Sequence, residues 1–200
     1  MLCLLLAAVA GGCHTAEPVT VYPSFTVAPA LAAQAPTQIA VLPVEDGTDD
    51  RAAERHLVFL RQEVMRQLVD RLYTPISSQA VDTALRGTGG VGAAEAAGSR
   101  SSVLDPTWLR RVVGRAAEDA ALALRIDRWD ESKLLINRRV YFQFQASLVG
   151  KDGQQLWYGT LSGEVKAGGA GAAPRDRDYM ARSCAEIAIR QLLLRLPSPH

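Results

Sequence analysis

Apolar and polar residues alternate most regularly between residues 140 and 148. The apolar residues that share one side of this segment are Val140, Phe142, Phe144, Ala146 and Leu148. Because successive side chains of a strand point to opposite faces, this period of two predicts a strand with one covered and one wetter face. Further strands are predicted over residues 122–127 and 156–165, and the turn formers at 150–153 join the last two strands. Together the three strands form a meander.

Two longer segments show helical spacing of their apolar residues. The first has an apolar stripe made of Leu57, Leu60, Val64, Leu68 and Leu72. The second lies between Arg175 and Leu196, and its stripe consists of Met180, Cys184, Ile187, Ala188 and Leu192. Residues spaced by three and four lie on one side of a helix, so both segments are predicted to be amphipathic helices packed on a sheet. Asp49 or Asp50 is the expected N-cap of the first.

Shorter elements complete the pattern. Residues 39–44 are an apolar run typical of a strand buried on both faces, and residues 73–77 predict a short edge strand because Pro75 lacks an amide donor. Residues 78–86 predict a short helix, and Asp105 followed by Pro106 predicts the start of another. The glycine, alanine and serine residues between 87 and 102 predict a loop.

The order of these elements is strand, helix, strand, helix, helix, three strands, helix. It predicts an α/β (α+β) fold with a mixed sheet of about five strands, whose last three form the meander. The long first helix and the C-terminal helix are expected to pack on this sheet. The length of 200 residues fits a single domain, predicted over residues 38–200, with an N-terminal extension.

Composition argues against several functions. The net charge of +1, with acids and bases interspersed, gives no electrostatic basis for binding nucleic acid. The three cysteines and three histidines have no metal-ligand spacing, so neither a metal nor a cofactor is predicted. His14 and His200 lie in predicted tails, and His56, the remaining histidine, is expected on a charged helix surface. No catalytic residue is therefore predicted, and the chain is expected not to be an enzyme.

Four acids, Glu45, Asp46, Asp49 and Asp50, follow the first predicted strand. Ligands often bind at the carboxyl ends of strands in open α/β sheets, so a small ligand here is one possibility. The acids lack the spacing of a calcium-binding loop. A turn whose acids cap the next helix is the preferred interpretation.

Four aromatic residues are candidates for partner binding: Trp129, Tyr141, Trp157 and Tyr158. Placed together on the less covered face of the sheet, they would form a patch of the kind found at protein interfaces. Ordinary packing of these rings at a half-buried surface is the alternative.

The N-terminus has the pattern of a secretory signal. Residues 2–10 are apolar, and they are followed by Gly11, Gly12 and Cys13. Cysteine directly after small residues resembles the lipobox of bacterial lipoproteins, although Ala10 stands where that family usually has leucine. No basic residue precedes the apolar run, which a start placed downstream of the natural one would explain. Residues 1–12 are thus expected to be a signal peptide, which such a start would truncate.

This resemblance implies that Cys13 carries a covalent lipid and becomes the first residue after cleavage. His14, rather than an aspartate, follows the cysteine, which by the sorting rule of such proteins implies the outer membrane. Residues 13–37 contain Pro18, Pro23, Pro29 and Pro36 and are rich in alanine. They are predicted to be an extended tether between the lipid and the folded domain.

Several segments together resemble a group of small bacterial outer-membrane lipoproteins. They are the lipobox, the proline-rich spacer, the strand at residues 39–44 and the sequence Gln-Leu-Trp-Tyr-Gly at 155–159. The group shares a domain similar to the TolB N-terminal domain, the curli secretion lipoprotein CsgG and the penicillin-binding-protein activator LpoB. The resemblance implies a domain lipid-anchored at the periplasmic face of the outer membrane.

The expected function is a non-catalytic structural or adaptor subunit of an envelope complex. Its partners would be other envelope proteins or further copies of the chain. An auxiliary or oligomeric component of a transport or secretion system is the first alternative. An envelope hydrolase is the second, and it would lose activity after His56→Ala or Asp46→Ala.

Overall fold

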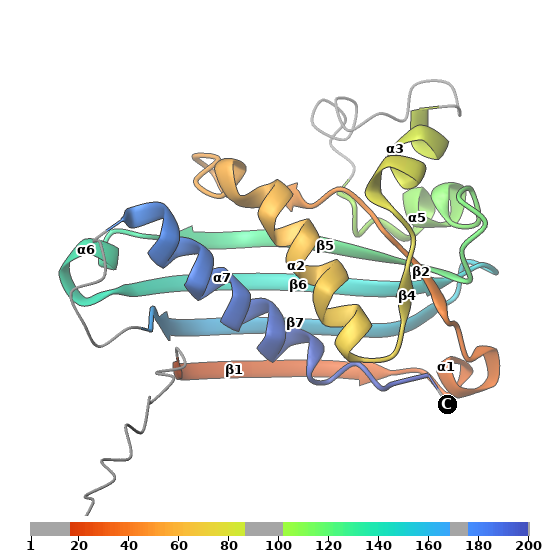
Figure 1. Cartoon of the computed structure of the whole chain (residues 1–200). Helices are drawn as coiled ribbons and strands as arrows, with labels where there is room; N and C mark the ends of the chain where they lie inside the picture. The colour runs from red at the N-terminus through yellow and green to blue at the C-terminus, as the bar shows by residue number, and fades with distance from the viewer. Residues whose placement is uncertain (1–16, 87–101, 169–175, 200) are drawn as a thin grey trace, which may run out of the picture.

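The computed structural model describes residues 17–86, 102–168 and 176–199. Seven strands form one sheet in the order β1-β7-β6-β5-β2-β4, with β3 paired to β5 (Figure 1). The strands are β1 (Glu17–Val27), β2 (Gln38–Val41), β3 (Glu45–Asp46), β4 (Thr74–Pro75), β5 (Ala120–Asp130), β6 (Arg139–Gly150) and β7 (Gln155–Lys166). The helices are α1 (Ala30–Gln34), α2 (Leu57–Asp70), α3 (Ser78–Arg86), α5 (Pro106–Val112), α6 (Leu134–Asn137) and α7 (Arg177–Leu193), and a 3-10 turn (Glu54–His56) precedes α2.

The predicted fold class is confirmed. The strands β5, β6 and β7 form the antiparallel meander, while β2 runs parallel to both β4 and β5, so the sheet is mixed. The sheet has two strands that the sequence did not predict, β1 and β3. None of the helices in the described ranges is long and apolar enough to cross a membrane.

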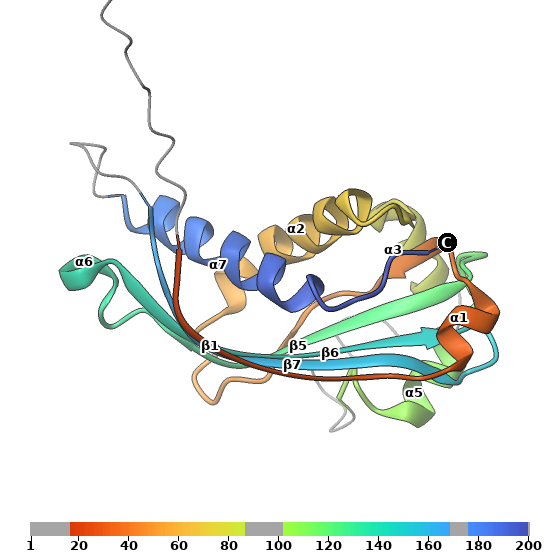
Figure 2. The same cartoon turned by 90° about the horizontal axis from the view of Figure 1, so that it is seen from below.

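The two faces of the sheet are covered to different extents. The helices α2 and α7 lie along one face (Figure 2), where the predicted apolar side of β6 joins them in the main hydrophobic core. A smaller core lies on the other face, where α3 and α5 pack on Ala40 of β2, Leu42 just after it, Ala121 and Ala123 of β5, and Val149 of β6. This second layer therefore covers only the end of the sheet near β2.

Residues 17–27 correct the prediction of an extended tether over residues 13–37. They form β1, an edge strand antiparallel to β7, and residues 30–34 form the short helix α1. Between its prolines, side chains of this segment point alternately to the core and to solvent. Val21 contacts the main core, whereas Tyr22 is 68% exposed. Proline is tolerated at the edge of a sheet, where an amide donor is not needed on the outer side. The prolines are therefore compatible with a strand as well as with a spacer.

The helices largely follow their predicted patterns. All five residues of the α7 stripe are buried, and the Asp105 carboxylate caps α5 by accepting from the amide of Thr107 at 2.7 Å. In α2 the predicted stripe is buried at Leu60, Val64 and Leu68, but Leu72 follows the helix and is 74% exposed. The predicted signal peptide, Cys13 and most of the glycine-rich loop at 87–102 lie outside the described residues.

Gly163 in β7 is needed for β1 to pair. A Cβ atom at this position would lie 2.2 Å from the carbonyl oxygen of Thr20 and 2.8 Å from Cα of Val21. These atoms belong to the bulged part of β1, where the register shifts between Pro18 and Thr20. The close approach of the two backbones thus requires glycine.

We expect Gly163→Ala to lower the free energy of unfolding by about 2 kcal/mol, because the methyl group overpacks against the β1 backbone. Urea unfolding measures this loss. Hydrogen exchange should show faster exchange of β1 amides with little change between β5 and β6. Ser162→Ala, on the neighbouring residue, is the control and should change stability little. A Gly163→Ala protein as stable as the wild type would contradict the placement of β1.

Candidate functional site

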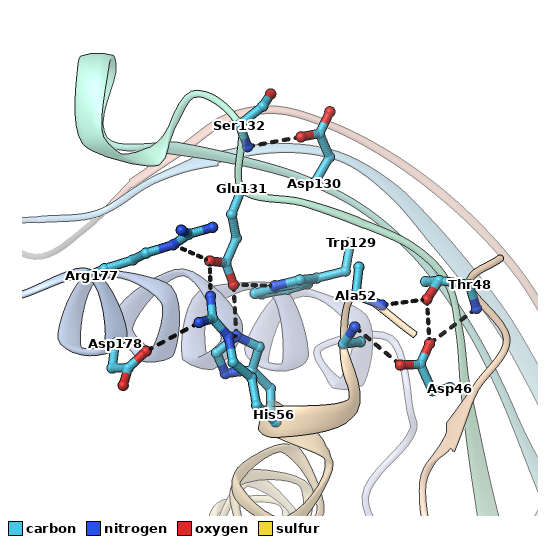
Figure 3. A network of polar contacts seen from close by, with 12 residues as sticks. Asp46, Thr48, Ala52, His56, Trp129, Asp130, Glu131, Ser132, Arg177 and Asp178 are labelled. Atoms are coloured by element: carbon cyan, nitrogen blue, oxygen red, sulfur yellow. Dashed lines mark hydrogen bonds and ion pairs between the residues drawn. The ribbon is translucent and has the colours of Figure 1, made fainter. Parts of the chain in front are cut away.

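The carboxylate of Glu131, directly after β5, is buried and bound on both oxygens (Figure 3). Its Oε1 accepts a hydrogen bond from the Trp129 indole at 2.7 Å and lies 2.6 Å from Nε2 of His56. Its Oε2 accepts from Nε of Arg177 at 2.9 Å and forms an ion pair with Arg55. This network, which we call the Glu131 network, joins the end of β5 to the starts of α2 and α7.

His56 does not lie on the helix surface as predicted. It is 3% exposed, because the 3-10 turn before α2 directs its ring inward, 5.4 Å from the Trp129 ring. An ionised carboxylate only accepts hydrogen bonds, so Nε2 of His56 must carry a hydrogen and donate to Glu131. Nε of Arg55 lies 3.1 Å from the same nitrogen, which has no free lone pair to accept from it. His56 thus acts as a donor to Glu131.

The environment of Glu131 keeps it ionised. Burial by itself raises the pKa of the carboxyl group, but hydrogen bonds from His56, Trp129 and Arg177 and the charge of Arg55 outweigh burial and lower it to about 2. A carboxylate with such a low pKa and with both oxygens occupied is a poor general base. The network is therefore suited to holding elements together, not to transferring protons.

A second polar cluster shapes the loop after β3. The Asp46 carboxylate accepts from the amide and hydroxyl of Thr48, at 3.0 and 2.6 Å, and from the amide of Ala53 at 3.0 Å. The Thr48 hydroxyl accepts from the amide of Ala52 at 2.9 Å (Figure 3). The predicted turn is present, but the predicted helix cap is wrong, because neither the 3-10 turn nor α2 has a side-chain cap. Asp46 instead supports the loop before the 3-10 turn.

A polar groove of about 760 Å³ lies between this loop and the end of β5. Its charged lining residues are Asp49, Asp50, Arg55, Asp127, Arg128, Asp130, Glu131 and Arg177. Both acids and bases line it, and the described residues contain no cluster of histidine, cysteine and acidic side chains able to hold a metal ion. Such a lining is better suited to binding a polar partner surface that carries both signs of charge than to binding a single ion.

The groove continues onto an uncovered part of the sheet, which we call the open face. It consists of the β1, β7 and β6 side chains that point away from α2 and α7. These are Tyr22, Ser24, Thr26, Tyr141, Gln143, Gln145, Tyr158, Thr160 and Ser162. All are exposed or half-buried, and no helix of the described residues packs on them. Sheets with one face open to solvent are common. On this open face, hydrogen bonds also hold some of the side chains in place.

A chain of hydrogen bonds orders the open face. The Tyr158 hydroxyl donates to Gln145 at 2.7 Å, and the Gln145 amide donates to Asp127 at 2.6 Å. Asp127 also accepts from Arg125 at 2.8 Å, and Arg125 pairs with Glu45 at 3.5 Å. These contacts cross from β7 to β3 and fix the side chains in position. Burial and the nearby Asp127 raise the pKa of Tyr158, which therefore stays protonated as a donor.

The four aromatic candidates divide into two pairs. Tyr141 and Tyr158 lie on the open face, as the predicted patch requires. Trp129 and Trp157 are only 3% and 1% exposed, so they belong to the core and cannot contact a partner. Trp129 turns inward because a bulge between Ile126 and Arg128 shifts the register of β5 by one residue. Trp157 is in phase with the buried Leu161 and Val165 of its own strand.

Cys184 matches its prediction as a small buried residue of α7. It is fully buried, and its thiol lies 3.8 Å from the carbonyl oxygen of Val165. Burial raises the pKa of the thiol to about 12. A thiol that remains protonated and inaccessible is not a nucleophile.

No family model matches the chain, and no curated protein matches it. Among solved structures, lipoprotein GNA1162 from Neisseria meningitidis is 19% identical with a TM-score of 0.48, over 68% of this chain and 88% of that chain. A PelC dodecamer from Paraburkholderia phytofirmans is 13% identical with a TM-score of 0.46, over 87% and 95%. The LpoB C-terminal domain from Salmonella enterica is 16% identical with a TM-score of 0.42, over 65% and 82%. Likenesses this distant say nothing about what the present chain binds.

The low pKa of Glu131 predicts a pH dependence of stability. The folded state binds fewer protons than the unfolded chain, whose glutamate has a pKa near 4.5. Glu131 therefore contributes roughly 3 kcal/mol above about pH 5, and this contribution is lost as the pH falls towards 2. Glu131→Gln should be clearly less stable than wild type at pH 6, and the difference should shrink at lower pH.

Urea unfolding of both proteins from pH 6 to pH 3 measures this difference. Glu54→Gln provides the matched control, because Glu54 is exposed and forms a surface ion pair with Arg51 at 3.3 Å. The free energy of unfolding of Glu54→Gln should stay close to that of the wild type at every pH. A Glu131→Gln deficit that stays constant with pH would show that the charge of Glu131 is not what stabilises the fold.

Proposed function

We propose that the chain is a lipoprotein, anchored through Cys13 at the periplasmic face of the outer membrane, and a non-catalytic adaptor subunit of an envelope complex. Its domain binds a partner protein on the open face and the adjoining groove. The observation that carries this proposal is the asymmetry of the sheet. One face is packed by α2 and α7, whereas on the other face no helix of the described ranges covers β1, β7 and most of β6.

The chemistry of the open face supports binding to a protein. It carries three tyrosines, a residue type enriched at protein interfaces because its ring provides apolar contact and its hydroxyl a hydrogen bond. The hydrogen-bonded chain from Tyr158 to Glu45 holds part of this surface in position before binding. A preorganised surface loses less side-chain entropy when it binds.

The residues that a hydrolase would need are already engaged. His56 donates to Glu131, the Asp46 carboxylate supports its own loop, and Cys184 is buried. These contacts favour a structural role for each of the three residues. None of them therefore supports the hydrolase alternative.

An oligomeric assembly is the second candidate, with another copy of the chain as the partner. The feature that favours it is β1, which forms an edge of the sheet and has one side without a strand neighbour in the described structure. An exposed edge can pair with a strand of another copy. Pro18 and Pro23 lie in that strand and weaken such pairing, so we rank this candidate second.

The lipid anchor is tested at Cys13. In a Gram-negative host, the wild-type chain should fractionate with outer membranes, need detergent for extraction and show an intact mass that includes acyl chains. Cys13→Ser should lack that mass and appear in the aqueous fraction. Cys184→Ser is the control for cysteine loss and should stay lipidated. A wild-type chain of unmodified mass would refute the anchor.

The docking face is tested by photo-crosslinking in intact cells. A photoreactive amino acid at Gln143, exposed on the open face, should give a discrete crosslinked product. The same group at Val58, which is 72% exposed on α2 on the other side of the sheet, should give none. Mass spectrometry of the product separates a different envelope protein from a second copy. Equal products from both positions, or products from Val58 alone, would contradict docking on the open face.

A further inference from the structure

The short helix α6 presents two apolar side chains to solvent at the tip of the β5–β6 connection. Leu135 is 60% exposed and Ile136 is 85% exposed, whereas the preceding Leu134 is completely buried in the main core. Isolated exposed apolar residues are common on protein surfaces. Two adjacent large ones at the outermost point of a connection form a small apolar surface, and nothing in the fold accounts for it.

The backbone holds this tip in one conformation. The amide of Leu134 donates to the carbonyl of Glu131 at 2.9 Å, and the amide of Arg138 donates to the carbonyl of Leu134 at 3.0 Å. Arg138 takes a left-handed conformation with φ +62°, and its carbonyl accepts from the amide of Ala167 at 2.8 Å. Leu135 and Ile136 are therefore presented on a fixed support.

The segment that contains α6 carries positive charge. Residues 132–139 contain three basic residues and no acid. Arg139 is paired with Glu164 at 2.9 Å, while Lys133 is exposed, with its ammonium 5.2 Å from the Tyr141 ring. Apolar side chains flanked by lysine and arginine match the surface of an anionic bilayer. The apolar groups enter the acyl boundary, and the bases remain among the phosphates.

The position of the tip agrees with a membrane location. Glu17, the first residue of β1, pairs with Lys166, and Lys166 pairs with Arg139, so the three lie on one rung of the sheet beside α6. Figures 1 and 2 show the start of β1 and α6 at the same end of the molecule. Cys13 is only four residues before Glu17, so a fully extended chain spans at most about 14 Å. A lipid on Cys13 would hold this end of the sheet close to the bilayer.

We propose that the α6 tip is a second membrane contact, in which Leu135 and Ile136 insert into a bilayer surface rich in anionic phospholipid. This inference rests on the proposed anchor for bringing the tip to the membrane. Tyr179, 60% exposed in the first turn of α7 at the same end, has a ring suited to the interface. The two contacts together fix how the domain is oriented on the membrane.

Insertion is tested on the full lipidated chain reconstituted in vesicles of phosphatidylglycerol and phosphatidylcholine. Ile136→Cys is labelled with the environment-sensitive fluorophore NBD, and peptide mass spectrometry confirms the labelled site. Cys184 is buried and should not react. The label at 136 should shift to shorter emission wavelengths and be quenched by lipids brominated on their acyl chains.

Leu72→Cys is the matched control, because Leu72 is 74% exposed but lies next to β4, at the opposite end of the sheet. A label there should stay in water and be unaffected by brominated lipid. If the label at 136 behaves like the label at 72 on protein whose intact mass confirms the lipid, the inference is overturned and the anchor stands. Crosslinking of position 136 to a protein, with no lipid quenching, overturns it as well.

A second measurement keeps the inference independent of the anchor. The full-length Cys13→Ser chain should bind the anionic vesicles weakly, and its binding should fall at least about tenfold when Leu135 and Ile136 are both changed to serine. Binding should also weaken at high salt and on vesicles of phosphatidylcholine alone. Both side chains point into solvent, so the double variant should unfold like its parent. Equal vesicle binding by the two proteins would overturn the inference.

Discussion

One buried carboxylate, that of Glu131, connects the elements on which the rest of the structure depends. A charge withdrawn from water is costly, and it is tolerated only where hydrogen bonds and opposite charges surround it. Here those partners come from β5, from the turn before α2 and from the start of α7. A shift of either long helix would therefore take hydrogen-bond partners away from the buried carboxylate. The carbonyl of Glu131 also accepts from the amide of Leu134, the first residue of α6, so the same residue helps to position both the helical layer and the exposed tip.

Features set by local patterns were predictable from the sequence. The alternation along β6, the stripe of α7 and the capping by Asp105 each depend on residues a few positions apart, and all three are as expected. The Glu131 network was not predictable, because His56 and Glu131 are 75 residues apart and neither has a local signal. The same limit applies to Trp129. A period of two continued from Ile126 places it on the open face, but the extra residue in β5 reverses its direction.

The wrong prediction of a tether over residues 13–37 has a similar cause. Its prolines and small residues are compatible both with a spacer and with an edge strand, and what decides between them is the free edge of β7, about 140 residues later in the chain. There Gly163 leaves the β1 backbone room to approach. Strand pairing is decided by the partner strand as much as by the segment itself. Val21 and Phe25 alternate with more polar neighbours, which is a local sign of a strand, but residues 13–37 do not determine by themselves that it pairs with β7.

This change in the N-terminal segment alters what an anchored domain can do. The predicted extended spacer, made of the 24 residues from His14 to Thr37, would let the domain reach up to roughly 75 Å from the membrane. With β1 in the sheet, only a few residues would separate the proposed lipid on Cys13 from the folded domain, and the α6 tip would lie beside that attachment. The two proposed points of attachment at one end would hold the strands at a limited range of angles to the bilayer. The open face would then point sideways along the membrane, where a partner embedded in or bound to the same membrane would meet it at a raised effective concentration. A modest interface would suffice for binding under those conditions, and this agrees with a surface that is polar, ordered and only partly aromatic.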